Sequence, residues 1–275
     1  MAVNPLQKYF RQPKIYVRLP SRGLFSSLGS IENASDELPV MSMTGMDELI
    51  LKTPDALLNG SATVKVIESC CPNIKNGWEI SSLDLDMMLI AIRIATYGPN
   101  MDVGHVCANC GSDNDYDVNL MNLIEHFNTC KYDPKVVLKD LTVYIKPLSY
   151  KVMTQFNSKN FELQSQLRQA LEIEDEEVKD RLISELYEKL ASLQNESYLE
   201  SVERVEAPEG TVDERAYILE WLQNSEKSIF TAIKEQIDLN NKTWRIPNMP
   251  VKCENCGHDS ELEIEMDQAS FFAVS

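Results

Sequence analysis

Two cysteine pairs carry the strongest chemical signal in the sequence. Cys107 and Cys110 belong to one Cys-x-Asn-Cys-Gly motif, and Cys253 and Cys256 belong to a second copy. Two cysteines at this spacing, closed by a glycine, form a knuckle whose thiolates converge on one metal ion. One knuckle supplies only half of a tetrahedral site. The two copies together supply the four thiolates of a structural zinc ribbon, so we predict one structural Zn²⁺ per chain, bound by all four cysteines.

The predicted site is split, because residues 111–252 separate the two knuckles. A folded insertion of this length is tolerable, since the entropy cost of closing a loop grows only logarithmically with its length. Two alternatives stay open: turns that hold free thiols without metal, and a redox dithiol. The dithiol is disfavoured because neither pair begins a helix after a strand. His105 and His258 each lie beside a knuckle and could replace a cysteine, but with four thiolates available we expect them outside the ligand set.

The remaining reactive residue types form no catalytic pattern. The chain has three histidines, no Gly-rich phosphate loop and no Gly-x-Ser-x-Gly motif, so we predict that it is not an enzyme. Cys70, Cys71 and Cys130 lack ligand spacing and are predicted to be small buried side chains. His126, near Cys130, is expected to be solvated or satisfied in the core.

The chain is strongly acidic, with 26 basic and 43 acidic side chains and a net charge of −17. Such a protein repels a phosphate backbone, so no nucleic-acid partner is expected. No apolar run approaches the ~20 residues that span a bilayer, and the N-terminus lacks the apolar segment of a signal peptide. Residues 1–31 differ, because they hold five basic and no acidic side chains. They are either a protected edge strand or an arm that docks on an acidic partner.

The elements around the first knuckle predict a mixed body over residues 1–148. Residues 15–19 and 38–43 have strand patterns that could pair, and Thr44 is placed to cap a helix through Leu51. A further helical turn is expected over residues 55–60. Residues 83–97 are apolar around most of a helix circumference, which indicates a core helix.

The second half of the chain predicts an insertion and a return. Residues 136–145 have the pattern of a β-hairpin. Residues 149–242 are expected to be an acidic helical hairpin or bundle, largely helical to about Leu239. Residues 243–275 bring the second knuckle back as ribbon strands, and Asp267 can cap a final turn. The predicted fold class is therefore α+β, with a split four-cysteine ribbon and an inserted helical region.

Several short stretches occur in an order that is characteristic of one family. They are Arg18-Leu19-Pro20-Ser21-Arg22-Gly23, Glu37 to Glu48, Leu57-Leu58-Asn59-Gly60, Ile67-Glu68-Ser69-Cys70-Cys71, Asp84-Leu85-Asp86 and Ile92 to Gly98, followed by the first knuckle. With this order the chain resembles the baseplate hub proteins of T-even-type contractile-tailed bacteriophages and, more loosely, the tail-assembly chaperones of other contractile phages. The resemblance covers roughly residues 15–150 and the final ribbon strand.

The resemblance implies a non-enzymatic late protein that helps to build the baseplate hub by binding other hub or tail proteins. It implies a location in the host cytoplasm during assembly or in the virion tail baseplate, and it leaves the partner and the oligomeric state open. Two alternatives remain. One is a zinc-ribbon factor that binds nucleic acid or acts in transcription, and the other is a transient tail-assembly chaperone that is absent from the virion.

Overall fold

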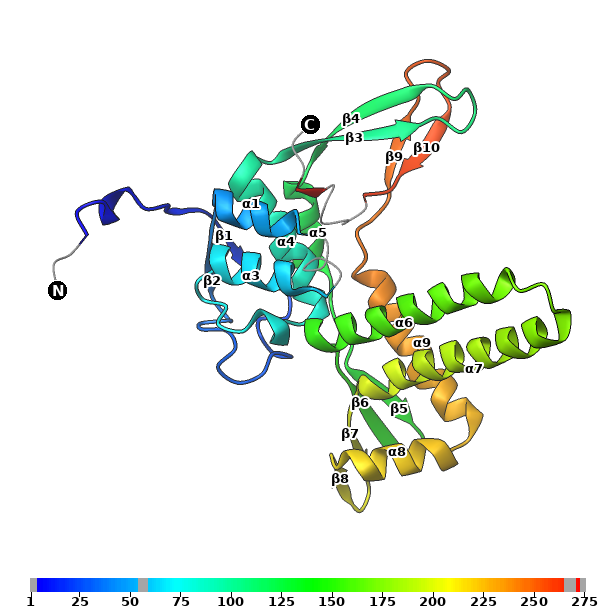
Figure 1. Cartoon of the computed structure of the whole chain (residues 1–275). Coiled ribbons are helices and arrows are strands. Elements are labelled where there is room, and N and C mark those ends of the chain that lie inside the picture. The colour runs from blue at the N-terminus through cyan, green and yellow to red at the C-terminus, as the bar shows by residue number, and fades with distance from the viewer. Residues whose placement is uncertain (1–3, 54–58, 265–270, 273–275) are drawn as a thin grey trace. The chain divides into compact units, whose positions relative to one another are not determined.

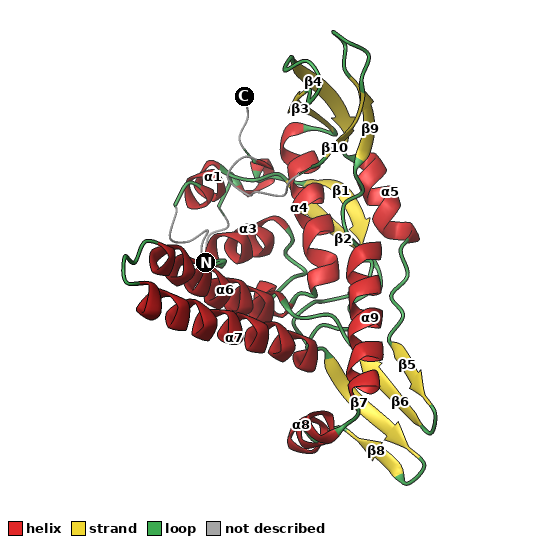
Figure 2. Cartoon of the chain, turned by 90° about the vertical axis from the view of Figure 1, so that its right-hand side faces the viewer, coloured by secondary structure: helices red, strands yellow, loops and turns green. Residues whose placement is uncertain are grey.

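Helices and strands both contribute to the fold, which confirms the predicted α+β class. The computed structural model describes residues 4–53, 59–264 and 271–272 (Figure 1). Figure 2 distinguishes the helices from the strands in a second view. The helices are α1 Gly45–Leu51, α3 Ser61–Cys70, α4 Ser82–Tyr97, α5 Met121–Thr129, α6 Tyr150–Leu171, α7 Glu176–Glu200, α8 Arg215–Asn224 and α9 Lys227–Thr243, with 3₁₀ turns at Gln7–Tyr9 and Gly77–Glu79. The strands are β1 Pro13–Arg18, β2 Glu37–Met41, β3 Asn100–Val106, β4 Asp113–Asn119, β5 Lys135–Leu138, β6 Leu141–Ile145, β7 Val202–Ala207, β8 Gly210–Val212, β9 Met249–Lys252 and β10 Asp259–Leu262.

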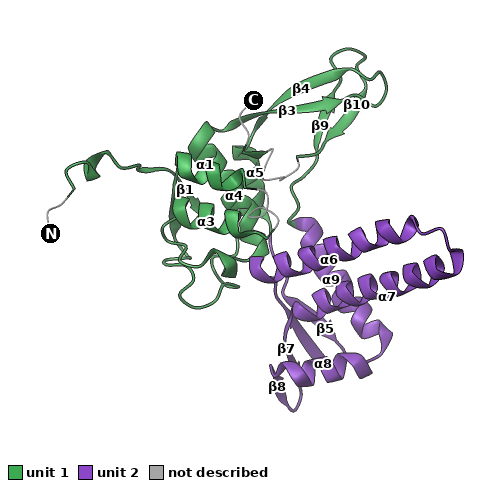
Figure 3. Ribbon diagram, viewed as in Figure 1, with its two compact units in different colours: residues 1–130, 244–275 green, residues 131–243 purple. Residues whose placement is uncertain are grey.

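The chain divides into two compact units, shown in Figure 3. Unit 1 combines residues 1–130 with 244–275, and unit 2 is the insertion, residues 131–243. The insertion is predicted from the sequence to start at residue 149. Unit 2 starts earlier because the β5–β6 hairpin pairs with β7 in one sheet, of strand order β5-β6-β7-β8. Two further expectations, the turn over residues 55–60 and the cap at Asp267, involve positions outside the described residues.

Helix α4 is the centre of unit 1. Met87, Met88, Ile90 and Ile92 are fully buried, so these methionines fill the core as predicted. The antiparallel pair β1–β2 contributes Val17, Leu38 and Val40 to the same buried set, and Leu19 is buried directly after β1. Ile15 pairs with Val40, as the sequence patterns predict. Thr44 caps α1 in a capping box with Asp47, which confirms the predicted helix start.

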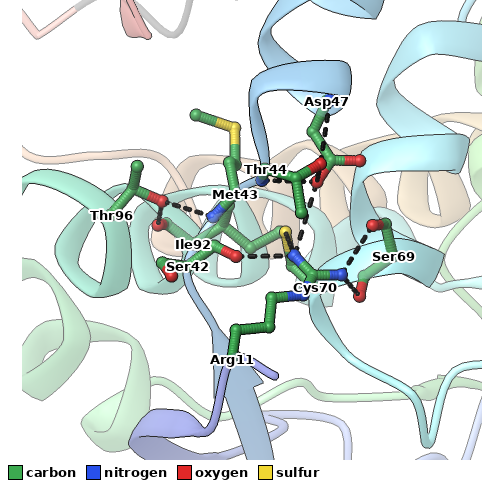
Figure 4. A network of polar contacts seen from close by, with 9 residues as sticks. All are labelled: Arg11, Ser42, Met43, Thr44, Asp47, Ser69, Cys70, Ile92 and Thr96. Carbon is green, nitrogen blue, oxygen red and sulfur yellow. Dashed lines mark hydrogen bonds and ion pairs between the residues drawn. The ribbon is translucent and has the colours of Figure 1, made fainter. Parts of the chain in front are cut away.

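A partly buried polar network holds the N-terminal segment against the rest of unit 1 (Figure 4). The Arg11 guanidinium donates to the carbonyl oxygens of Ser42 (2.6 Å) and Ser69 (2.5 Å) and lies 3.4 Å from Asp47 Oδ2. Asp47 also accepts hydrogen bonds from the backbone and side chain of Thr44, both at 2.7 Å. Arg11 therefore joins three segments that lie far apart in the sequence.

A second network joins the loop after β1 to α4. The Ser21 backbone N–H donates to Asp84 Oδ1 at 2.9 Å, and the Ser21 hydroxyl donates to the other carboxylate oxygen. Gly23 follows with a φ of +73°, and a Cβ there would lie 2.4 Å from Ala34 Cβ, so only glycine fits. Burial raises the pKa of Asp84 to about 6, although the bonds from Ser21 favour its charged form.

Unit 2 combines helices with a sheet. Most of the stretch from residue 149 to 239 is helical, as predicted, but β7 and β8 interrupt it, and the strand at residues 202–207 was not predicted. Glu, Arg and Ala favour a helix locally, but cross-strand contacts with β6 decide the outcome. Val205 pairs with Val143 in the buried core, and the Arg204 guanidinium lies 3.6 Å from the centroid of the Tyr144 ring. The β5–β6 hairpin confirms the expectation for residues 136–145.

Candidate metal centre

Each cysteine motif forms the tip of a β-hairpin. The β3–β4 pairing ends at Val106 and Asp113, and the β9–β10 pairing ends at Lys252 and Asp259. In the first tip the Cys107 carbonyl accepts from the Gly111 N–H at 2.8 Å, and in the second the Cys253 carbonyl accepts from the equivalent glycine at 2.9 Å. Both glycines have a φ of +70°. The repeated sequence motif therefore produces a repeated backbone turn.

The two tips bring the four cysteine sulfur atoms together. All four lie within 4.8 Å of one another. The Cys107 and Cys256 sulfurs are 3.7 Å apart, and so are the Cys110 and Cys253 sulfurs. A disulfide requires ~2.05 Å, so these contacts are not covalent. A tetrahedral ion with ~2.3 Å bonds to sulfur holds its ligands ~3.8 Å apart, and the observed spacing fits that geometry.

The asparagine in each motif links the two knuckles. The Asn109 side-chain amide donates to Cys256 Sγ at 3.6 Å. In the reciprocal contact, the Asn255 amide lies 3.9 Å from Cys110 Sγ and donates to Ser112 Oγ at 2.8 Å. The asparagine of one tip thus contacts the second cysteine of the other. Such amide contacts stabilise negative charge on sulfur and orient the ligands.

The local hydrogen bonds favour thiolates at two of the four positions. The hydrogen bond between Cys110 Sγ and Ser112 Oγ lowers the pKa of Cys110 to about 6, and the backbone N–H of Cys256 lowers the pKa of Cys253. At Cys107 the backbone N–H of Cys110 acts in the same direction, but burial and bonds to neighbouring sulfurs outweigh it and raise the pKa to about 11. Four thiols this close compete for negative charge, and a bound cation would relieve that competition.

Further contacts hold the two hairpins in register. The Tyr116 hydroxyl on β4 donates to the Lys252 carbonyl at 3.1 Å, and the Glu254 N–H donates to Asn114 Oδ1 at 3.0 Å. Asn114, Tyr116 and Ser112 were not predicted to be part of the site. Their proximity to the first motif was the only available signal, because their partners lie in the second hairpin.

The other residues singled out from the sequence lie outside the cluster. His258 is exposed, and only its carbonyl takes part in the turn, accepting from the Cys253 N–H at 2.9 Å. His105 contacts Tyr116 through its ring, with the centroids 6.4 Å apart. Cys70 and Cys71 are fully buried, as predicted, and burial raises their pKa values to about 12 and about 11. His126 Nε2 lies 3.5 Å from Cys130 Sγ.

Comparison with known proteins assigns the family. The family model described as "T4 bacteriophage base plate protein" matches residues 35–273. The match covers most of the chain, including both knuckles and the whole insertion, so the chain belongs to the T4-type phage baseplate protein family. No curated protein and no solved structure matches it. Among the residues that the structure describes, no helix is long and apolar enough to cross a membrane.

Proposed function

We propose that this baseplate protein is a non-enzymatic structural or assembly component of the baseplate hub, acting through contacts with other tail proteins. The family match over residues 35–273 carries the proposal. The candidate metal centre supports it, because four protein thiolates would leave no coordination position for a substrate. Within the described part of the chain, these cysteines form the only metal-competent cluster of His, Cys, Asp or Glu.

The proposed Zn²⁺ has a structural role. Cys107 and Cys110 would hold it from one hairpin, and Cys253 and Cys256 from the other, so the ion cross-links the two ends of unit 1 that flank the insertion. Metal binding would contribute directly to folding, because the site does not exist in the unfolded chain. We expect a chelator to lower the unfolding temperature of the wild-type protein. A chelator should have little effect on a Cys110→Ser variant, whereas a large effect on that variant would contradict the assignment.

The N-terminal segment offers a surface for a tail-protein partner. Tyr9, Phe10 and Tyr16 are 73%, 56% and 61% exposed, and Lys8 and Lys14 are exposed beside them. Exposed aromatic side chains among basic ones suit a partner with an acidic surface, because rings supply contact area while charge steers the encounter. Co-purification with other tail proteins should weaken in a Tyr9→Ser, Phe10→Ser variant. Retention of every partner by that variant would remove this segment from the interface.

The nucleic-acid alternative has less support. It needs the basic residues near the N-terminus to face a phosphate backbone, yet Arg11 is engaged with Asp47 and Arg18 lies 3.9 Å from Glu37. We expect no tight DNA or RNA binding in a filter assay at low salt. Tight binding that weakens steeply with added salt would favour this alternative.

The chaperone alternative differs from the hub role only in whether the protein is present in the finished virion. A structural hub component remains in finished particles, and a transient chaperone leaves them. Mass spectrometry of purified virions, compared with infected-cell lysate, separates the two. We expect peptides of this chain in the virion, and their absence from particles that contain the other baseplate proteins would support the chaperone.

A further inference from the structure

Within unit 2, the hairpin formed by α6 and α7 leaves most of its surface unpacked by the described residues. The two helices lie side by side (Figures 1 and 2). Only Tyr150 and Ala170 are buried among the 22 residues of α6, and only Leu186, Leu193 and Tyr198 among the 25 of α7. Helices in proteins take most of their stability from packing an apolar face. This hairpin is therefore a surface on which further helices can pack.

One face of the hairpin carries a groove between the two helices. Phe156 and Asn160 line it from α6, and Tyr187, Leu190 and Ala191 line it from α7. Lining residues on each helix recur every three or four positions, so each set occupies one helix face. Tyr187 is 59% exposed although its ring is largely apolar. No lining residue is charged, in a chain whose net charge is −17.

The two helices differ in charge. Helix α6 carries three basic side chains and one acidic, so it is net basic, whereas α7 carries three basic and seven acidic. The hairpin thus presents an uncharged groove between a basic helix and an acidic one. Such a surface is complementary to a second copy of itself when the copy is rotated so that α6 faces α7.

We propose that this groove is a homodimer interface, in which the α6–α7 hairpins of two copies form an antiparallel four-helix bundle. Each α6 packs against α7 of the other copy, with a two-fold axis parallel to the helices. The uncharged lining lets two acidic proteins approach without burying like charges, and the basic and acidic helices select this arrangement over one that pairs α6 with α6. Antiparallel neighbours with apolar facing positions are the usual geometry of such bundles.

The available area is close to what a stable dimer requires. A 22-residue helix is ~33 Å long, and two adjacent helices are ~20 Å wide, so the face measures ~650 Å². Stable protein interfaces bury ~800 Å² on each partner. Protruding side chains make the accessible surface of the face larger than this estimate for a flat rectangle. Dimerisation through this groove requires neither the metal centre nor a role in the hub, so it can be tested independently of both.

The first test is the mass of the full-length protein in solution, measured by light scattering during size-exclusion chromatography. We expect a dimer for the wild type and a monomer for Tyr187→Asp, which places a charge in the groove. Tyr217→Asp is the matched control, because Tyr217 is a 64% exposed tyrosine on α8 of the same unit, and it should remain dimeric. A monomeric wild type, or a Tyr187→Asp variant as dimeric as the control, would overturn the proposal.

The second test addresses which helices pair, using one exposed charge on the groove side of each helix. One variant reverses the charge on α6 with Arg168→Glu, four residues after Gln164 of the groove lining, and the other reverses it on α7 with Asp180→Lys, seven residues before Tyr187. In the proposed bundle each variant alone places like charges together and should be monomeric. Their mixture restores opposite charges at both helix contacts and should form a heterodimer. A mixture that stays monomeric while both variants retain their helical circular dichroism would exclude this arrangement.

Discussion

Replacing Arg11 with alanine should destabilise unit 1 far more than replacing other basic residues near the N-terminus. The guanidinium donates to two backbone carbonyls and lies 3.4 Å from Asp47, whose side chain is only 6% exposed. Hydrogen bonds from a charged donor contribute ~1.5–3 kcal/mol each, and an unpaired buried carboxylate adds a penalty. Asp47 keeps its bonds from Thr44, and the Arg11 side chain is 25% exposed, so water offsets part of the loss. We expect a cost of ~2–4 kcal/mol.

Arg18→Ala provides the matched control for this prediction. The Arg18 side chain is 49% exposed and lies 3.9 Å from Glu37, an exposed ion pair that contributes ~0–1 kcal/mol. Hydrogen exchange of the α4 amides in increasing urea reports the opening of unit 1 for both variants. Arg11→Lys should fall between the wild type and Arg11→Ala, since an ammonium lacks the planar fork that reaches both carbonyls. If Arg11→Ala costs no more than Arg18→Ala, the network does not hold unit 1 together.

Two further predictions concern Asp84 and Gly23. The pKa of Asp84 rises on folding from 3.8 to about 6, so its contribution to stability is present below pH ~4 and is lost as the pH rises through 6. The free energy of unfolding of Asp84→Asn minus that of the wild type should therefore be ~3 kcal/mol larger at pH 8 than at pH 4, as measured by urea unfolding. A difference that does not change with pH would contradict this. Gly23→Ala should cost ~2–4 kcal/mol because it adds a clash with Ala34 to backbone strain, whereas Gly29→Ala, with a φ of +80° and open space, should cost only ~1 kcal/mol. Equal melting temperatures for the two alanine variants would show that Ala34 moves freely.

The sequence predicted elements whose stability is local. The capping box at Thr44 and the apolar circumference of α4 depend on neighbours within a few residues, and both match the structure. Strand β7 was missed because its residues favour a helix and become a strand only when β6 pairs with them. Ser21, Asp84 and Asp47 lie in three of the short stretches that carry the family resemblance, but nothing in one sequence indicates that Ser21 contacts Asp84 or that Arg11 contacts Asp47.

The four cysteines could be predicted as one cluster because an internal repeat is visible without a structure. The contact between Asn109 of one knuckle and Cys256 of the other could not, since it depends on how the two hairpin tips face each other. The repeat shows that each motif contains an asparagine, but only the structure shows that its side-chain amide contacts a cysteine sulfur of the other motif. The same limit applies to Asn114 and Tyr116, whose partners lie in the other hairpin.

The central claim is that two distant knuckles form one zinc site, and the zinc content of the purified chain tests it most directly. Elemental analysis, combined with native mass spectrometry of protein prepared without chelator, should give one zinc per chain, because four thiolates complete a single tetrahedral site. Cys256→Ser should lose most of the metal, and the matched Cys130→Ser variant should retain it, because Cys130 lies outside the cluster. Two zinc ions per chain, or none in the wild type, would contradict the split site.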